Sequence, residues 1–489
     1  MSVREYIGAR YVPIFLGEWD NTVNYEPLSV VQNLGNSYTS RQYVPAGTPL
    51  TNNDFWAETG NFNAQVESYR QEVLAFDGRI DALEDKFPIT STSIANGAIL
   101  GKVKENTVFK TPEMYGAIGN GSYDDSAAFQ DMFDDLETGD IVILCQKNYV
   151  LRHAVKCEKD YISIVGMGCT EGTPNLRIIR DSEPTGNDKY GLIIRGKQNS
   201  LTNIVLTNYA NEYVYNDTYL LFLDGSFSET DYQLDTKIVN CAFGRASNHI
   251  AISGRNVKIT NCKFSAWDNN SIELQNPAIS RMVGYIIENN RFHGGGFEPV
   301  CCVDTRKVTT YTSIFSLTMQ NNFIDVVGMI YRGITDNVTI ANNTYYQHVH
   351  GYDYVIDFTH TVIASTGNVT SVIGNVFSNK SPGTAIRGFL RTYSDECAGI
   401  FYISDNVFTS AYASAHAIIV IRGGNTDPCY VVISNNSLNG GNTATPVQIV
   451  TNSANLQGFV SGNFIRTKAT NFVTVNGGVT EGVNYGITY

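Results

Sequence analysis

The sequence predicts an all-β protein whose main part is a parallel β-helix. Three observations support this prediction: a composition suited to strands and turns, a repeat of short strands, and one isolated helix signal directly before that repeat. The 489 residues include 43 Gly, 29 Tyr and 24 Phe, which suit strands and turns better than helices. A short repeated unit cannot bury its apolar face alone and must stack on its neighbours, so the repeat predicts a solenoid.

The repeat is seen in stretches that end in Asn-X-aromatic, such as "VNCAFG", "ENNRFH" and "IGNVFS". Each unit also carries a second short apolar strand, such as "NHIAIS" or "AIIVIR". The units recur at intervals of roughly 20 to 32 residues, a range typical of solenoid repeats. We expect Phe and Tyr to stack inside the coils and the turn Asn side chains to form ladders. Cys241 and Cys262 stand where other units have Asn, so we expect ladder members rather than metal ligands.

Composition and charge argue against several classes of protein. The net charge of −13 argues against a general nucleic-acid binder, which usually carries a basic face. No apolar run reaches about 18 residues, so the sequence predicts neither a transmembrane helix nor a membrane partner. The N-terminus lacks the charged and apolar regions of a secretory signal. The nine Cys are scattered, odd in number and without a C-x-x-C pair, which indicates free thiols formed in a reducing cytoplasm.

The first predicted element is a small β module over residues 1–62. Its aromatic residues, among them Trp19, Tyr25 and Trp56, are separated by turn-forming Gly, Pro and Asn. Two interpretations are open: the aromatic faces stack on sugars, or they form the small core of an attachment domain. The second is preferred, because a domain of this size needs nearly every aromatic side chain for its core.

A helical stalk is predicted over residues 63–87. Apolar residues follow one another there in steps of three and four, which is the spacing of a coiled-coil seam. The residues of this seam are Val66, Tyr69, Val73, Phe76, Ile80, Leu83 and Phe87. The alternative is a helix that lies on a globular core. Residues 88–111, which are rich in Ser, Asn and Gly, are predicted to be a spacer.

The β-helix is predicted over residues 112–489, and the isolated helix signal lies at its start. In "NGSYDDSAAFQDMFDDL", Asp124 or Asp125 is placed to be the N-cap, and apolar residues follow at helical spacing to Leu136. A solenoid exposes strand edges at its ends and needs caps there. We therefore expect the helix over 126–136 to close the N-terminal end of the β-helix.

Charged residues recur on the second strands of successive units, at positions predicted to point outward. They fall into one column or two adjacent ones: Glu273, Asp304, Arg306, Arg332, Asp357, Arg387, Arg391 and Arg422. Stacked strands bring such side chains within about 5 to 10 Å of one another. The alternative to a functional surface is a solvated face of salt bridges. A register slip of one residue would turn every side chain to the other face.

These residue types predict chemistry on a charged or sugar polymer. Carboxylates can act as general acid or base, so the catalytic candidates are Glu273, Asp304 and Asp357. Guanidinium groups bind phosphate or carboxylate through paired hydrogen bonds, so the substrate-binding candidates are Arg306, Arg332, Arg387, Arg391 and Arg422. A neutral polysaccharide would instead need exposed aromatic side chains, for which the candidates are Tyr311, Tyr331, Tyr345, Tyr346, Tyr352 and Tyr354.

No cofactor is required by this pattern, although a divalent metal is compatible with it. His348 and His350 point the same way in an extended segment and could bind a metal together with a nearby carboxylate. Pairs of His at this spacing are common by chance, so the prediction for the metal site is none.

Two stretches resemble known families. "YGAIGNGSYDDS", residues 115–126, is similar to the start of pectate-lyase-superfamily right-handed parallel β-helices, with Asn120 where their usual Asp stands. "GARYVPIF", "YEPLSVV", "GNSYTSRQYVPAGT" and "WAETGNFNAQVESYR", within residues 8–70, resemble the pre-neck appendage (tailspike) proteins of small podoviruses that infect Gram-positive bacteria. In architecture this second resemblance extends to about residue 480.

The appendage resemblance implies a homotrimer in the virion, made in the host cytoplasm. It implies that residues 1–62 join the head–tail connector and that the β-helix binds, and often cleaves, a host cell-wall glycopolymer such as teichoic acid. Some members carry a C-terminal chaperone segment that is removed by self-cleavage, and none is expected after "GVNYGITY". Two functional classes stay open: a depolymerase, with hydrolysis favoured over lyase chemistry, and a non-catalytic receptor-binding spike.

Overall fold

The chain divides into two compact units in the computed structural model, Met1–Ala95 and Asn96–Tyr489, which are described separately. In the first unit the structure describes residues 12–61. In the second it describes residues 109–488 without the segments 168–173, 209–214, 228–232, 276–280, 295–299, 309–313, 326, 347–353, 361–367, 380–387, 393–398, 411–417, 423–427, 442–446, 451–454, 468–472 and 476–477. The predicted stalk over 63–87 and most of the predicted spacer lie outside the described residues.

The described part of the first unit is a four-stranded sheet with the order β1-β2-β3-β4. Its strands are β1 (Ile14–Glu18), β2 (Ser29–Asn33), β3 (Asn36–Ser40) and β4 (Trp56–Asn61). The strand β1 runs parallel to β2, and the other pairs are antiparallel. Tyr25 and Trp56 lie in the core with Val31, Val44 and Leu50, and the two rings pack edge to face at 5.3 Å. These aromatic side chains therefore form a small core, as the preferred interpretation of the sequence had it.

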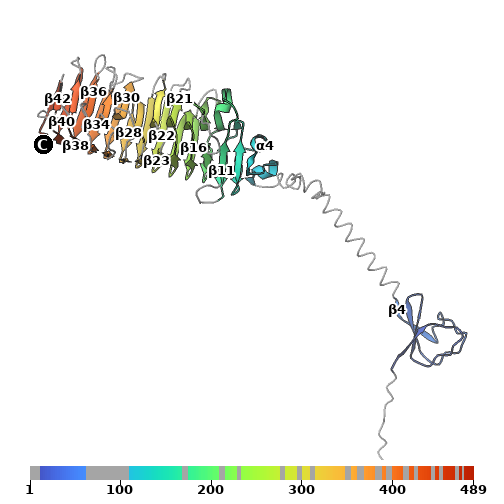
Figure 1. Cartoon of the computed structure of the whole chain (residues 1–489). Helices are drawn as coiled ribbons and strands as arrows, with labels where there is room; N and C mark the ends of the chain where they lie inside the picture. Colours follow the sequence, from blue (N-terminus) through green and yellow to red (C-terminus); the bar gives the residue numbers. More distant parts are fainter. Residues whose placement is uncertain are drawn as a thin grey trace, which may run out of the picture. The chain divides into compact units, whose positions relative to one another are not determined.

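The second unit is a parallel β-helix with three sheets (Figure 1). Successive strands go to the three sheets in turn, as β22, β23 and β24 do. The β5–β43 sheet contains β5 (Phe109–Lys110), β7 (Ile141–Leu144), β10 (Ser163–Gly166), β13 (Ser200–Thr202), β16 (Gln233–Val239), β19 (Arg255–Thr260), β22 (Arg281–Glu288), β25 (Ile314–Gln320), β28 (Val338–Ala341), β31 (Val369–Ile373), β34 (Gly399–Ser404), β37 (Cys429–Ser434), β40 (Leu456–Ser461) and β43 (Gly478–Glu481).

The other two sheets are built in the same way. The β6–β44 sheet contains β6 (Asn120–Asp124), β8 (Asn148–Leu151), β11 (Asn175–Ile178), β14 (Val205–Thr207), β17 (Ala242–Phe243), β20 (Lys263–Ser265), β23 (Arg291–His293), β26 (Phe323–Asp325), β29 (Thr344–Tyr345), β32 (Val376–Asn379), β35 (Val407–Ser410), β38 (Ser437–Gly441), β41 (Phe464–Thr467) and β44 (Tyr485–Thr488). The β9–β42 sheet contains β9 (Val155–Cys157), β12 (Tyr190–Ile194), β15 (Tyr219–Asp224), β18 (Asn248–Ser253), β21 (Asn270–Gln275), β24 (Cys301–Lys307), β27 (Met329–Ile334), β30 (Tyr354–His360), β33 (Gly388–Thr392), β36 (Ile419–Arg422), β39 (Val447–Val450) and β42 (Val473–Val475).

Two kinds of row inside the coils were predicted from the repeat and are confirmed. The rings of Phe243, Phe264 and Phe292 stack with centroids 4.9 and 4.6 Å apart. At the turn between the β5–β43 and β6–β44 sheets, Asn side chains form a ladder in which each amide donates to the Oδ1 of the next Asn. Its members are Asn290, Asn322, Asn343, Asn375, Asn406, Asn436, Asn463 and Asn484. Cys262 continues the ladder, because its backbone N–H donates to Asn290 Oδ1 at 2.8 Å.

The helix predicted over 126–136 runs as α4 (Ser126–Asp134), at the start of the β-helix in Figure 1. Its buried side chains, Phe129, Met132 and Phe133, belong to the same core cluster as the coils. Asp125 directly before α4 is fully buried, and its carboxylate accepts from the N–H groups of Ile118 and Val150 at 2.8 and 3.1 Å. This carboxylate joins the turn before α4 to strand β8 and thereby holds the cap on the coils.

The described residues also contain short 3₁₀ helices: η1 (Pro112–Tyr115), η2 (Gly186–Lys189) and η3 (Gly225–Phe227). Across the part of the chain that the structure describes, no helix has the length and apolar character needed to span a membrane.

Candidate functional site

Five charged residues of the β9–β42 sheet stand in register on adjacent strands. Glu273 pairs with Asp304, Asp304 with Arg332, Arg332 with Asp357, and Asp357 with Arg391. We call these five residues the charged column. Because adjacent strands lie about 4.8 Å apart, neighbouring members are close enough to interact directly. Ala251 stands before Glu273 and Val420 after Arg391 in the same register, so the charges occupy five consecutive coils.

Two of the other predicted binding residues, Arg306 and Arg422, stand beside the column. Arg306 follows Asp304 by two residues on β24, and Arg422 follows Val420 by two residues on β36. Residues two apart on a strand share a face, so both arginines lie on the same side as the column. Arg387, His348 and His350 lie outside the described residues.

At the Glu273 end, four side chains surround one carboxylate. Tyr219 donates its hydroxyl to Oε1 at 2.6 Å, and Lys307 places its ammonium 2.8 Å from the same oxygen. Asn270 and Gln275 add amide donors, each at 3.1 Å. Burial and the Glu273 carboxylate raise the pKa of the Tyr219 hydroxyl, which keeps it protonated as a donor.

The Asp304 carboxylate is held by Arg306. The guanidinium donates from Nε to Oδ1 and Oδ2 at 3.0 Å and from Nη2 to Oδ2 at 2.6 Å. The backbone N–H of Arg306 adds a fourth bond to Oδ1 at 2.9 Å. The hydrogen bond that Arg306 donates to Asp304 raises the pKa of the Arg306 guanidinium, so Arg306 stays charged.

The Asp357 carboxylate is shared by two arginines with unequal contacts. Arg391 donates to both oxygens in a fork, at 2.9 Å for each bond, and its guanidinium lies over the Tyr354 ring at 5.0 Å. Arg332 approaches the same carboxylate only to 3.9 Å. Its Nε is buried and has no hydrogen-bond partner within the described residues. Arg332 is therefore the guanidinium of the column with a free donor.

The carboxylates are less accessible than the sequence suggested. The side chains of Glu273, Asp304 and Asp357 are 4, 3 and 5% exposed. The alternative of a salt-bridge face stays open for these three residues, since each is ion-paired, but their carboxylates are not solvated. Successive residues of the strands in this sheet are buried, as in β21 and β24. A side chain that points outward from this sheet can therefore still be buried. The partners Arg306 and Lys307 are about half exposed and form the accessible part of the site.

Three of the six tyrosines proposed for a neutral polysaccharide are wrong candidates. Tyr331, Tyr345 and Tyr354 are buried, because their positions on β27, β29 and β30 point into the coil or beneath Arg391. Tyr346 is 44% exposed, and Tyr311 and Tyr352 lie outside the described residues.

Sequence reasoning missed Tyr219 and Lys307. Tyr219 comes from β15, two strands before β21 in the sheet, and Lys307 comes from a bulged end of β24. The register of the sheet was the available signal. Tyr219 pairs with Asn248, which is three residues before Ala251, the β18 residue in register with Glu273. Among the described residues no group of three or more His, Cys, Asp or Glu side chains is arranged to hold a metal ion.

No protein-family model and no curated protein matches the sequence, whereas solved structures share the fold. The Agl-KA catalytic domain is 15% identical, and the match covers 76% of this chain and 68% of that chain with a TM-score of 0.53. The A-module of mannuronan C-5 epimerase AlgE6 from Azotobacter vinelandii is 13% identical over 77% of this chain and 99% of that chain, with a TM-score of 0.50. The pre-mature gene product 12 of bacteriophage phi29 is 12% identical over 73% of this chain and 52% of that chain, with a TM-score of 0.41. The first two similarities show the parallel β-helix fold and nothing finer.

Proposed function

We propose that this chain is a bacteriophage appendage whose β-helix binds and hydrolyses an anionic cell-wall glycopolymer such as teichoic acid. The observation that carries the proposal is the position of Arg332 between Asp304 and Asp357 in the charged column. The buried Nε of Arg332 has no hydrogen-bond partner among the described residues. A phosphate or carboxylate of the polymer would satisfy this donor through a charge-assisted hydrogen bond. The appendage resemblance of residues 8–70 supplies the polymer class.

Cleavage would use the carboxylates on either side of the bound anion. At a strand spacing of about 4.8 Å, the backbones of Asp304 and Asp357 are roughly 10 Å apart. In inverting glycoside hydrolases, carboxyl groups about 6.5–9.5 Å apart leave room for the attacking water. One carboxylate would accept a proton from water once its arginine had turned to the substrate, and the other, once protonated, would donate to the leaving oxygen.

The alternative is a receptor-binding spike that binds the polymer without cleaving it. The observation that favours it is the bidentate pairing of Asp304 with Arg306 and of Asp357 with Arg391. A carboxylate whose oxygens already accept from a guanidinium has fewer lone pairs free for a water molecule or a substrate. In this alternative the ion pairs only shape a surface on which arginines meet the polymer.

The test is to incubate the purified full chain with host cell walls and to analyse the bound protein and the released fragments. Hydrolysis predicts soluble fragments from the wild type, and a loss of about 10² to 10⁴ in release rate for Asp304→Asn at unchanged wall binding. Arg332→Gln should weaken wall binding, whereas Arg291→Gln on β23 of the β6–β44 sheet is a matched control and should not. A wild-type protein that binds walls and releases nothing would establish the receptor-binding alternative.

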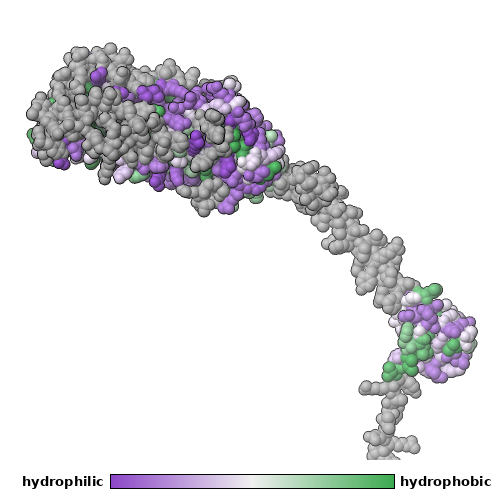
Figure 2. All heavy atoms as spheres, viewed as in Figure 1, coloured by the Kyte–Doolittle hydropathy of each residue, from purple (hydrophilic) through white to green (hydrophobic). Residues whose placement is uncertain are grey.

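The N-terminal module is proposed to attach the chain to the virion connector. Ile14, Phe15 and Leu16 on the edge strand β1 are all more than half exposed, and Figure 2 shows hydrophobic surface on this unit. An exposed apolar edge strand is a ready surface for pairing with another chain. A chain lacking residues 1–62 should still bind walls but fail to join particles. Incorporation of that truncated chain into particles would refute the attachment role.

A homotrimer is proposed for the β-helix. Apolar side chains are exposed in one register row of the β6–β44 sheet: Phe323, Val376, Val407, Phe464 and Tyr485. Thr344 and Ser437 fill the two intermediate positions of the row. Contiguous exposed apolar rows mark surfaces that another chain covers, and a second copy of this chain is the partner that the predicted stalk implies.

A further inference from the structure

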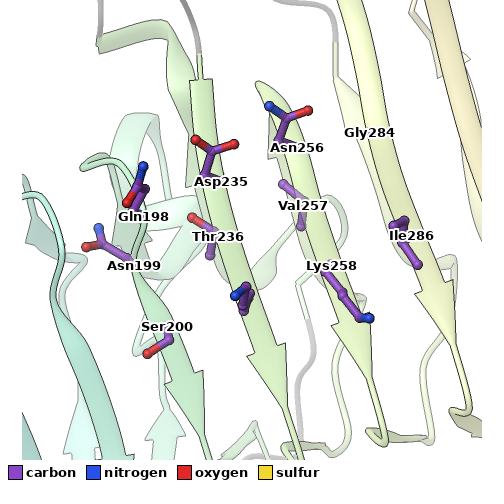
Figure 3. Close-up of a pocket in the computed structure, with 11 residues that line it drawn as sticks. Gln198, Asn199, Ser200, Asp235, Thr236, Asn256, Val257, Lys258, Gly284 and Ile286 are labelled. Atoms are coloured by element: carbon purple, nitrogen blue, oxygen red, sulfur yellow. The ribbon is translucent and has the colours of Figure 1, made fainter.

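A groove of about 710 Å³ lies on the outside of the β5–β43 sheet and crosses β13, β16, β19 and β22 (Figure 3). Its position is distinct from that of the charged column, which belongs to the β9–β42 sheet. Lys237 and Lys258 stand on the outer face, because the residues after them, Ile238 and Ile259, are buried in the core. The four strands span roughly 14 Å along the β-helix, which is a suitable length for a short stretch of polymer.

Irregular backbone forms one end of the groove. Asp235, Asn256 and Gly284 have positive φ values of 48°, 61° and 81° on three consecutive strands of the sheet. Register shifts occur beside Asp235 and beside Gly284. A Cβ at Gly284 would lie 2.2 Å from Asn256 Oδ1, so a larger residue would displace this amide. Bulges of this kind redirect side chains and are frequent next to binding sites.

The polar groups of the groove form two rows, which Figure 3 shows toward opposite ends of the strands. Ser200, Lys237 and Lys258 stand in register and make a hydroxyl and ammonium row. Gln198, Asp235 and Asn256 make an amide and carboxylate row at the bulged end. The side chains of Gln198 and Asn256 have no hydrogen-bond partner among the residues that the structure describes, so both amides are available to a ligand.

The ammonium row has an unbalanced charge. Like charges at directly paired positions destabilise a sheet, and Lys237 and Lys258 are such a pair. Lys258 is neutralised by Glu288 at 2.7 Å. Lys237 has no ion-pair partner within the described parts of the chain. An anionic group seated between the two ammonium groups would relieve the repulsion.

We propose that this groove is a second, non-catalytic binding site for an anionic, hydroxyl-rich polymer. A phosphate or carboxylate binds between Lys237 and Lys258. Hydroxyl groups of the same segment bind Ser200 and the amides of Gln198 and Asn256, which offer donors and acceptors in the way sugars and polyols require. The site lies on another sheet and would hold a long polymer whether or not the charged column cleaves it.

The test measures the binding of fluorescent poly(glycerol phosphate), polygalacturonate and dextran to the full chain carrying Arg332→Ala. In this variant the charged column contributes less to polymer binding. Lys237→Glu should weaken the binding of at least one anionic polymer about tenfold or more. The affinity that remains should depend less on the salt concentration than that of the parent chain. Lys237→Glu should keep the fold, because the new carboxylate pairs with Lys258. Lys263→Glu on β20 makes the same charge change on another sheet and should leave the affinity unchanged.

The two anionic probes distinguish a phosphate site from a carboxylate site, and binding of either supports the proposal. Unchanged affinity of both probes for Lys237→Glu and for Asn256→Ala would overturn it, as would dextran binding as tight as that of the anionic polymers. These outcomes are independent of cleavage, because the release rate from cell walls reports on the charged column and the Lys237 variants report on the groove.

Discussion

Replacing Asp357 by Asn tests whether the charged column is catalytic or only structural. The substitution keeps the size of the side chain and removes the charge that holds Arg391. Removing one partner of a buried ion pair destabilises a protein by about 3–5 kcal/mol. Asn keeps one acceptor oxygen, and the Arg391 side chain is 23% exposed, so water can replace part of the lost interaction. We therefore expect the free energy of unfolding to fall by about 2 kcal/mol.

The expected effect on cleavage is larger than the effect on stability. If Asp357 acts as the acid or base, the release rate should fall about 10²- to 10⁴-fold while the protein remains folded below its unfolding midpoint. The matched control is Arg391→Gln, which breaks the same ion pair but leaves the carboxylate. It should lose similar stability and bind walls more weakly, because Arg391 is a substrate-binding candidate, but at saturating wall concentration it should retain most of the release rate.

Both quantities are measured on the same samples, stability by denaturant unfolding and release by analysis of wall fragments. The double variant completes a mutant cycle that isolates the interaction of Asp357 with Arg391. A folded Asp357→Asn protein that releases fragments at the wild-type rate would refute a catalytic role for this carboxylate. Equal losses of release for Asp357→Asn and Arg391→Gln would show that the pair acts through the structure of the site.

Three further predictions concern stability and assembly. Burial lowers the pKa of His249 from 6.5 to about 4, so the unfolded chain takes up this proton at a higher pH than the folded chain. Stability should therefore be complete above pH 6.5 and fall by up to about 3 kcal/mol as the pH decreases toward 4, and His249→Gln should remove this part of an acid-unfolding curve. Asn375→Ala removes a ladder side chain that accepts from the backbone N–H and the amide of Asn343 and donates to a backbone carbonyl. It should lower the free energy of unfolding by roughly 3 kcal/mol or more, whereas exposed Thr344→Ala should change it little, and equal denaturant midpoints for the two would contradict the ladder argument. Val407→Glu places a charge in the exposed apolar row and should shift sedimentation from trimer toward monomer, and an unchanged trimer would show that this row is not the interface.

The repeat itself was sufficient to predict the β-helix, its stacked Phe rings and its Asn ladder. Each coil places the same residue type at the same local position, so the contact between coils follows from the order of residues within one unit. Asn290 and Phe292 are two residues apart and meet their counterparts Asn322 and Ile324, also two residues apart, in the next coil. The cap helix was equally local, because its N-cap and apolar spacing lie within one short segment.

The charged column was predictable in part. Period-two alternation along β21, β24 and β30 indicates which side chains point outward, and Glu273, Asp304 and Asp357 do stand on one face in register. Their catalytic role stays a prediction, as do the binding roles of the arginines. The proposed tyrosines failed at Tyr331 and Tyr345, because a count of aromatic residues near the strands does not distinguish inward from outward positions.

By itself, the sequence determined the architecture of this protein: the coil repeat, the ladder, the stacked rings and the cap, all of which depend on residues close together in the chain. Only the tertiary structure decided that the three carboxylates are nearly inaccessible, that Tyr219 reaches Glu273 from two strands away, and that Arg332 Nε has no hydrogen-bond partner among the described residues. It also revealed the groove at Lys237, which depends on positive φ values in three successive coils and on register shifts in two of them. The physical reason is that the burial and pairing of outer-face side chains depend on neighbouring coils, which are separated in sequence by segments of unequal length. Which side chains point inward depends only on the alternation within each strand.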